Sequence, residues 1–321
     1  MSISRRQFLE TTALGGLAVN TMTGAAVDSK SGMPTRILGR TGARVSIIGF
    51  GSGSRWLAYK DEDKALAAMN KAIDMGINYI DSANQYGNGQ SETWAGKVMK
   101  TRRKEVWLVT KIEKRNGDEA MKMIEGALKR LQTDHIDLIH VHALLGADDL
   151  AKIEAPDGVL KVLYKMRDQK VCRAIGITCH ANPVVLRDAL EHNDFDCTQM
   201  ALNAAKVGNV FGKAAEGFSG SFEQTALPVA LRKKMGITAM KVFAQERLNG
   251  KAPVEKLISY ALSLPVAAAV IGMPQVAHIE QNIQVAKAFK PLSRAEMDNM
   301  NREMLPLKAS IDHFFAHHID C

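Results

Sequence analysis

The sequence predicts an α/β protein whose main unit is a single (β/α)8 TIM barrel followed by a C-terminal helix. Short apolar runs alternate with amphipathic helical segments eight times between residues 35 and 289. Several of these runs are apolar at nearly every position, which is typical of parallel strands that are buried on both faces. No linker or low-complexity segment divides the 321-residue chain after residue 26.

Eight segments are predicted to form the strands of the barrel. Each is a short run of apolar and β-branched residues, bounded by polar residues or glycine. In chain order these segments are 45–50, 78–81, 106–111, 136–142, 173–178, 197–202, 237–242 and 267–272.

A helix is predicted after each strand. The clearest covers residues 118–132, where apolar side chains recur every three or four positions and share one face. The other helices are predicted near 62–75, 90–100, 158–169, 182–193, 222–235, 253–263 and 276–289. Ser293 and Glu296 then have the spacing of a capping box, which predicts the start of the C-terminal helix.

The first 26 residues are predicted to be a twin-arginine signal peptide. Arg5 and Arg6 precede a short, weakly apolar stretch, and the small residues at 23–26 offer a cleavage site. The order of these features favours a signal over a frayed basic tail. We therefore expect a protein that meets the twin-arginine export machinery and becomes periplasmic or otherwise exported, with its barrel in residues 35–321.

Composition and charge narrow the range of partners. The chain is 46% hydrophobic and has a formal charge of +8, which would attract a phosphorylated ligand. It lacks the basic stripe and the recognition motifs of nucleic-acid-binding proteins, so we expect no nucleic acid. It also lacks an apolar run of about 20 residues, so we expect no membrane span. The four cysteines include no CxxC pair.

Four ionisable residues belong to three consecutive β/α units. Asp81, Lys111 and His142 end predicted strands, and Tyr86 stands in the loop after the first of them. Active sites of such barrels form at the carboxyl ends of the strands, so these side chains should converge. Each residue alone has an ordinary structural explanation, but their joint placement at one rim favours chemistry. The set suits protonation of a carbonyl oxygen or deprotonation of an alcohol, because an ammonium stabilises a phenolate.

At these residues the sequence resembles the aldo-keto reductase family. The resemblance extends over about 35–289 and is carried by GINYIDSANQYGNGQSE, VWLVTKI, IDLIHVH, AIGITCH and VIGMPQVAHIEQNI. It implies an N-terminal β-hairpin before the barrel, and an NAD(P)H-dependent oxidoreductase that interconverts an aldehyde or ketone with an alcohol. It further implies that Tyr86 is the general acid/base, that Lys111 and Asp81 tune it, and that His142 orients the carbonyl.

The resemblance also implies which residues hold the cofactor, NADP(H). Thr178 and Cys179 replace a Ser-Asn pair that grips the nicotinamide amide. The full expected set is Gly51, Asp81, Thr178, Cys179, Gln199, Met240, Lys241, Gly272, Met273, His278, Gln281 and Asn282. Many NADP-specific members carry Lys or Arg in the last segment, but 272–285 contains neither. NAD(H) is therefore left open as the cofactor.

Two other functions stay open from the sequence. A barrel of this kind can be a non-catalytic, nicotinamide-binding regulatory subunit, although the intact set of four residues argues against that role. His140 and His142 share one strand face, with His180 nearby, so a metal-dependent TIM-barrel hydrolase is the second alternative. Such hydrolases typically carry this pair on the first strand, and we expect no metal. The sequence does not specify the substrate or the oligomeric state.

Overall fold

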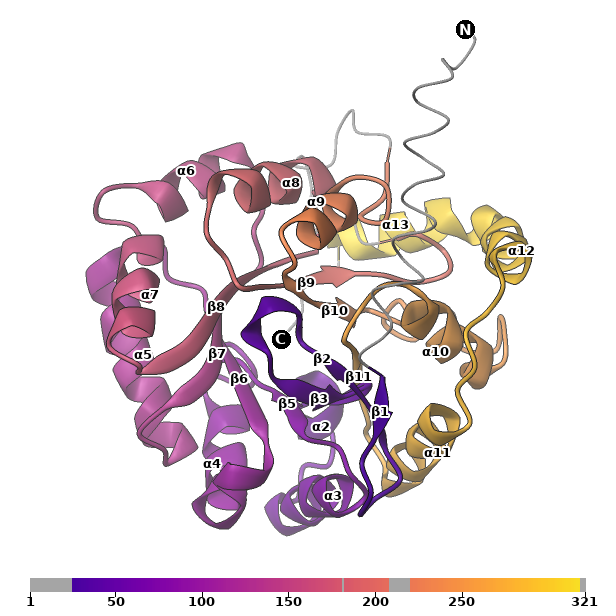
Figure 1. Ribbon diagram of the computed structural model, residues 1–321, viewed down its shortest axis with the longest axis horizontal. Coiled ribbons are helices and arrows are strands. Elements are labelled where there is room, and N and C mark those ends of the chain that lie inside the picture. Colours follow the sequence, from indigo (N-terminus) through magenta and orange to yellow (C-terminus); the bar gives the residue numbers. More distant parts are fainter. Residues whose placement is uncertain (1–24, 181, 208–219, 318–321) are drawn as a thin grey trace, which may run out of the picture.

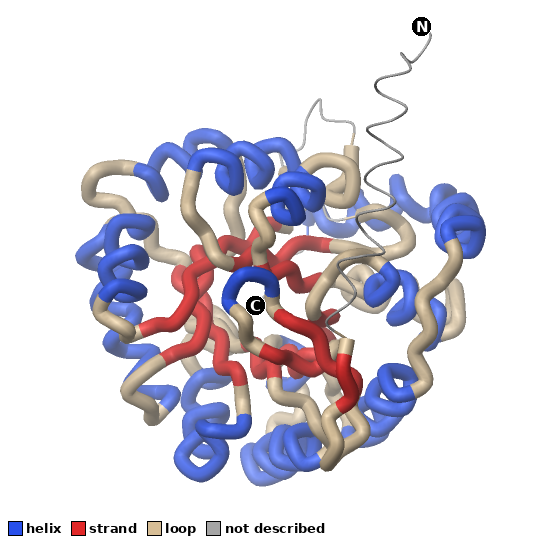
Figure 2. Tube along the Cα trace, in the orientation of Figure 1, coloured by secondary structure: helices blue, strands red, loops and turns tan. Residues whose placement is uncertain are grey.

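The structure is a computed structural model that describes residues 25–180, 182–207 and 220–317. Within these residues, eight parallel strands close into a barrel in the order β10-β11-β4-β5-β6-β7-β8-β9. Helices surround the barrel on its outer side (Figures 1 and 2). The predicted (β/α)8 fold is therefore confirmed. The predicted signal peptide lies outside the described residues, except for its last two positions.

The barrel strands coincide with the predicted apolar runs to within a few residues. They are Ile48–Gly51 (β4), Tyr79–Asp81 (β5), Trp107–Ile112 (β6), Ile136–Val141 (β7), Cys172–Cys179 (β8), Cys197–Ala201 (β9), Gly236–Met240 (β10) and Ala268–Gly272 (β11). Their register brings Lys111 of β6 beside His140 of β7, and Gly51 of β4 beside Asp81 of β5. The ends of neighbouring strands thus share one rim.

A small antiparallel sheet covers the amino ends of the barrel strands (Figure 1). Its strands are Ala26–Val27 (β1), Pro34–Ile37 (β2) and Arg44–Ser46 (β3). Leu38, in the turn after β2, is fully buried and approaches Gly236 at the start of β10. The predicted hairpin is therefore present, and a third strand extends it. Ala26, the last residue of the predicted signal, belongs to this sheet.

The predicted first strand, 45–50, is wrong as a single element. Its first part belongs to β3 of the small sheet and its second part to β4 of the barrel. The chain changes sheets at Ile47, whose N–H donates to the carbonyl of Pro34 at 3.0 Å. Every residue from Val45 to Phe50 is buried. A continuous apolar run therefore covers two strands, because both sheets bury it.

Helices follow the strands as predicted, with three additions. They are Ser54–Leu57 (α2), Glu62–Asp74 (α3), Gln90–Arg102 (α4), Gly117–Leu131 (α5), Ala147–Glu154 (α6), Val159–Asp168 (α7), Pro183–His192 (α8), Ala226–Arg232 (α9), Val254–Ser263 (α10), Val276–Lys287 (α11), Arg294–Met304 (α12) and Lys308–His317 (α13). The additions are α2, α6 and α13. Ser293 and Glu296 form the predicted capping box at α12.

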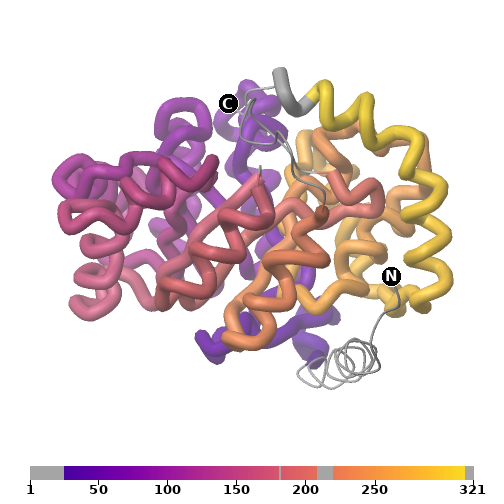
Figure 3. The backbone as a smooth tube through the Cα atoms, turned by 90° about the horizontal axis from the view of Figure 1, so that it is seen from above, coloured from indigo at the N-terminus to yellow at the C-terminus, as the bar shows by residue number. Residues whose placement is uncertain are grey.

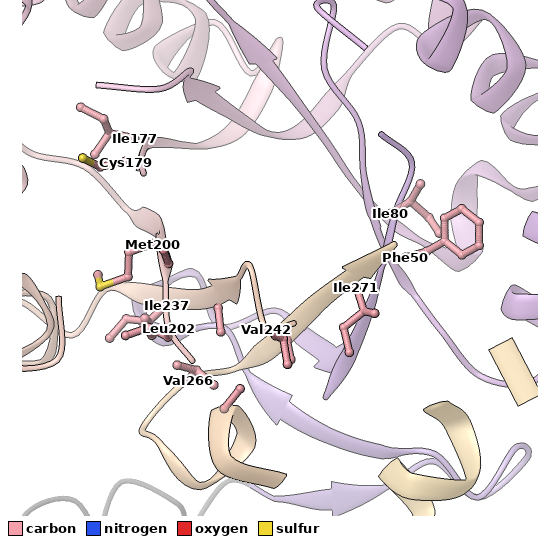
Figure 4. Packing of buried hydrophobic residues seen from close by; sticks show 14 of the residues in the cluster. Phe50, Ile80, Ile177, Cys179, Met200, Leu202, Ile237, Val242, Val266 and Ile271 are labelled. Atoms are coloured by element: carbon pink, nitrogen blue, oxygen red, sulfur yellow. The ribbon is translucent and has the colours of Figure 1, made fainter. Parts of the chain in front are cut away.

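Most of the hydrophobic core lies between the barrel and its helices. Figure 4 shows part of it, with Phe50, Ile80 and Ile271 contributed by three adjacent strands. The small sheet lies at one end of the barrel and α13 reaches the other end, where the carboxyl ends of the strands meet (Figure 3). Among the described helices, none combines the length and apolar character that crossing a membrane requires.

Candidate active site

Four ionisable side chains meet at the carboxyl ends of β5, β6 and β7. The ammonium of Lys111 donates to Asp81 Oδ1 at 2.5 Å, to the carbonyl of Ser82 at 2.8 Å and to the Tyr86 hydroxyl at 3.2 Å. These bonds use all three of its donors. The rings of Tyr86 and His142 pack edge to face with centroids 5.9 Å apart. The structure thus brings together the residues that the sequence placed at one rim.

The turn that carries Tyr86 is shaped by two glycines. Gly87 and Gly89 have φ values of +61° and +88°, in the left-handed region that favours glycine. The turn is also fastened to the helix that follows, because the N–H of Ser91 donates to the carbonyl of Tyr86 at 3.2 Å. The Ser91 hydroxyl in turn bonds that of Ser52 at 2.8 Å. The phenol therefore projects from a tightly held loop.

Charge is concentrated on Lys111, whose side chain is only 1% exposed. Burial alone would lower its pKa, but the Asp81 carboxylate and the Tyr86 oxygen outweigh burial and raise the pKa above its ordinary value. The second oxygen of Asp81 accepts a hydrogen bond from Gln199 Nε2 at 3.1 Å. Lys111 is therefore held in its charged form beside the phenol at neutral pH.

His140 on β7 and His142, which directly follows β7, are both neutral. Burial, and then the charge of Lys111, hold the pKa of His142 and of His140 well below the usual range. Both ring nitrogens of His140 are buried without a hydrogen-bond partner in the described structure. Its ring fills the space left by Gly176, where a Cβ would lie 2.4 Å from Nδ1. Within the described residues, no three His, Cys, Asp or Glu side chains group as metal ligands would.

A pocket with a volume of about 240 Å³ opens beside these residues. Tyr86, His180 and Gln199 contribute to its wall, and it extends to Gln281 and Asn282 on α11. Most of the residues expected near the cofactor line it: Gly51, Asp81, Gln199, Met240, Lys241, Gly272, His278, Gln281 and Asn282. The pocket wall is mixed in character, with amides, cations, carboxylates and apolar side chains.

Three expected cofactor residues are not in the pocket wall. Thr178 Oγ1 accepts the N–H of Ala143 at 2.8 Å. The side chain of Cys179 points to the opposite face of β8 from that of Thr178, because successive side chains of a strand alternate in direction. Its thiol donates to the carbonyl of Leu144 at 3.2 Å, and its side chain lies in the core (Figure 4). Met273 is fully buried in the same core. The side chains of Cys179 and Met273 therefore lie in the core and do not face this pocket.

Several pocket residues are absent from the set of cofactor residues that the sequence predicts. The sequence indicates His180 only as a metal ligand, but His180 lines the pocket, with its ring 6.5 Å from that of His142. Arg55 and Glu246 form an ion pair at 3.1 Å that joins α2 to the loop after β10. Arg55 lies over Gly272, where a Cβ would approach the arginine side chain to 2.7 Å. Gly272 is the one sign of this contact in the sequence, because a side chain there would collide with Arg55. The helix α2 itself has only four residues and is too short to show a helical pattern.

The loop that follows β10 has an unusual backbone. Lys241, Ala244, Gln245 and Glu246 have φ values of +58°, +46°, +53° and +69°, respectively. Such values cost a residue with a side chain roughly 1 to 3 kcal/mol each and cluster at ligand clamps. Because three of the four residues line the pocket, this strained loop belongs to the binding site.

Comparison with known proteins shows which family this chain resembles. A sequence model described as the aldo/keto reductase family matches residues 47–251. Aldo-keto reductase YhdN of Bacillus subtilis (strain 168) is 38% identical over 154 residues, which are 43% of this chain and 44% of that protein. The chain thus matches less than half the length of this relative.

Solved structures share the fold. The holo form of aldo-keto reductase AKR11C1 from Bacillus halodurans has a TM-score of 0.68 and 23% identity, covering 84% of this chain and 96% of that one. An aldo/keto reductase from Klebsiella pneumoniae, solved in complex with NADP and acetate, has a TM-score of 0.66 and 21% identity, covering 84% and 95%. Since the family's sequence model matches more than half of the chain, the protein belongs to the aldo/keto reductase family.

Proposed function

We propose that this protein is an NAD(P)H-dependent oxidoreductase that reduces an aldehyde or ketone to an alcohol, or catalyses the reverse reaction, with Tyr86 as general acid/base. The observation that carries the proposal is the hydrogen bond from the buried Lys111 ammonium to the Tyr86 hydroxyl. It joins a phenol in the pocket wall to a buried positive charge. A purely structural lysine has no need of a phenol at that position.

The pocket residues fit a nicotinamide dinucleotide. Gln199 presents an amide next to Asp81, which suits the carboxamide of a nicotinamide. Arg55 and Lys241 supply cations for a pyrophosphate, and Gln281 and Asn282 supply amides for an adenine. Amides at both ends with cations also in the wall are the donor set that an extended dinucleotide requires.

The proposed cofactor is NADP(H), with NAD(H) accepted as well. The name of the Klebsiella pneumoniae structure, which includes NADP, supports the first. The composition of 272–285, without Lys or Arg, supports the second, because a 2′-phosphate prefers an arginine fork or an ammonium. In this segment only His278 offers an ionisable nitrogen to the pocket.

The proposed chemistry divides between the cofactor and four side chains. When bound, the reduced nicotinamide supplies a hydride to the carbonyl carbon. Tyr86 gives its hydroxyl proton to the carbonyl oxygen, and Lys111 stabilises the phenolate that remains. Asp81 keeps Lys111 charged and in place. His142, as a neutral imidazole, donates a hydrogen bond to the same oxygen and so orients the carbonyl.

The test of this function is Tyr86→Phe in the purified protein. The variant should bind NADPH with an unchanged Kd and lose about 10²- to 10⁴-fold in kcat, the usual contribution of a positioned acid. Tyr59→Phe is the matched control, since the Tyr59 hydroxyl is buried and has no partner in the described structure. A Tyr86→Phe variant within threefold of the wild type would refute the assignment. Wild-type protein that binds NADPH but oxidises it with no carbonyl would favour the regulatory subunit.

Export through the twin-arginine route is a separate part of the proposal. Its support is the order of Arg5, Arg6, the apolar stretch and the small residues before 26. A double variant, Arg5→Lys with Arg6→Lys, should keep the protein in the cytoplasm when cells are fractionated. Equal amounts of wild type and variant in the exported fraction would contradict this route.

A further inference from the structure

The main chain turns sharply just after His142. Ala143 has a φ of +53°, in the left-handed region that is unfavourable for an L-residue with a side chain. Hydrogen bonds fix the turn on two sides. The N–H of His142 donates to the carbonyl of Ile112 on β6 at 2.9 Å, and the N–H of Ala143 donates to Thr178 Oγ1 on β8 at 2.8 Å. The direction of the His142 side chain therefore depends on a strained backbone step.

One guanidinium binds both carbonyl groups of this turn. Arg115 Nη2 donates to the carbonyl of His142 at 2.8 Å and to that of Ala143 at 3.2 Å. Its Nη1 donates to the carbonyl of Glu113 at 3.2 Å, in the loop that follows Lys111. Lys111 belongs to β6, and His142 belongs to the turn after β7. Arg115 thereby links the loop that follows β6 with the turn that contains His142.

The guanidinium is itself held by Asp149 in the first turn of α6. Nε donates to Oδ1 at 2.8 Å and Nη2 donates to Oδ2 at 2.9 Å, which is a bidentate pair. Asp149 Oδ2 also accepts the N–H of Leu145 at 3.1 Å, so the carboxylate grips the same loop. Both side chains are only 15% exposed. A lysine could supply the charge but not this planar fork.

We propose that Arg115 and Asp149 are a positioning pair for carbonyl reduction, which hold the backbone of His142 so that its imidazole meets the carbonyl oxygen beside Tyr86. The inference rests on the function proposed above. Arg115 donates to the main-chain carbonyls of His142 and Ala143, and neither Arg115 nor Asp149 lines the pocket, so the pair acts on the backbone that carries His142. A displacement of about 1 Å at a reacting group can lower the rate about 10²-fold. The gain in rate from a fixed His142 can therefore outweigh the cost of burying the charges of Arg115 and Asp149.

The test compares Arg115→Lys and Asp149→Asn with a matched control. Both variants should lose at least tenfold in kcat while the Kd for NADPH stays within twofold. The ring ¹⁵N signals of His142 should shift or broaden, as they would for a ring that has lost its fixed orientation. Arg167→Lys is the control, because Arg167 bonds Asp194 and Asp196 at 3.0 Å each near the amino end of β9. It should destabilise the fold without changing kcat more than twofold.

Two results would overturn the positioning role. One is a kcat within threefold of the wild type in both variants. The other is a loss that only follows the folded fraction, as in Arg167→Lys, with the His142 ring signals unchanged. A wild type without any carbonyl reduction would refute the proposed function, and the ring signals would then still decide whether Arg115 and Asp149 hold His142.

Discussion

A single ammonium, that of Lys111, joins Asp81 to Tyr86. It donates to the carboxylate at 2.5 Å and to the phenol at 3.2 Å while almost completely buried. Burial favours the neutral amine and the carboxylate favours the cation, so the charge of Lys111 depends on Asp81. The charge that lies beside the Tyr86 hydroxyl therefore depends on a carboxylate at the end of β5.

Asp81→Asn should remove the carboxylate that keeps Lys111 charged. Without the carboxylate, burial dominates and the pKa of Lys111 falls, so the cation is lost at a lower pH as the pH rises. The descending, alkaline limb of the kcat profile should therefore move to lower pH. Measurement of kcat between pH 6 and 10 checks this. Loss of a buried ion pair should also cost about 3 to 5 kcal/mol of stability.

Asp137→Asn separates the effect on stability from the effect on chemistry. Asp137 is a buried carboxylate near the amino end of β7, paired with Arg103 at 2.8 Å and Arg173 at 2.9 Å. Its variant should lose stability with no shift in the kcat profile. A similar shift in both variants would mean that the alkaline limb reports unfolding and not Lys111.

His278→Arg should increase the preference for NADPH. His278 lines the pocket on α11, where 272–285 has no Lys or Arg, and an arginine can form a charge-assisted fork with a 2′-phosphate. We expect the ratio of the Kd values for NADH and NADPH to rise about tenfold, or about 1.4 kcal/mol. Fluorescence titration with both cofactors measures it. Gln284→Arg, which adds the same charge to an exposed position of α11, should leave the ratio unchanged.

Glu246→Gln should speed the release of the cofactor. The pair of Glu246 with Arg55 joins the strained loop to α2 in the pocket wall, but its side chains are 48% and 36% exposed. An exposed pair is worth about 0.2 to 1 kcal/mol, so the dissociation rate should rise no more than about fivefold. Stopped-flow displacement of NADPH tests this. Glu62→Gln, which breaks a surface pair with Lys97, should have no effect.

The sequence predicts local features of this protein far better than contacts between distant segments. Asp81, Lys111 and His142 could be found because each ends an apolar run, and parallel strands bring such ends together. The turn to a second sheet at Ile47 could not be found, because both sheets bury the same run. That the Cys179 side chain lies in the core could not be predicted, because a resemblance gives a position in the chain and not the direction of a side chain.

The pairs that hold the site show the same limit. Arg115 with Asp149, and Arg55 with Glu246, join different β/α units, so no spacing within the chain marks them. Their members stand in loops or in short helices, where hydrophobic periodicity carries little information. Ion pairs between such segments follow from the closure of the barrel, which aligns all its carboxyl-end loops at one face.

The neutral histidines should make the fold sensitive to acid. The folded pKa of His140 and of His142 lies below the value of about 6.5 that each has when unfolded. As the pH falls below about 6.5, the unfolded chain therefore binds protons that the folded chain does not. The stability these groups contribute is complete above that pH and is lost below it, by up to about 1.4 kcal/mol per pH unit for each histidine.

His140→Leu isolates one of these two titrations. His140 makes no hydrogen bond through either nitrogen in the described structure. Leucine therefore removes a proton-binding group and leaves no other polar group without its hydrogen bond. The free energy of unfolding should then fall less steeply between pH 7 and 5 than in the wild type. The difference in slope should be at most about 1.4 kcal/mol per pH unit, the contribution of one histidine. Urea denaturation at pH 7, 6 and 5 measures it, with the surface variant His192→Gln as control. Parallel curves for His140→Leu and wild type would mean that the His140 imidazole is hydrated and protonated inside the barrel, contrary to its buried and neutral state here.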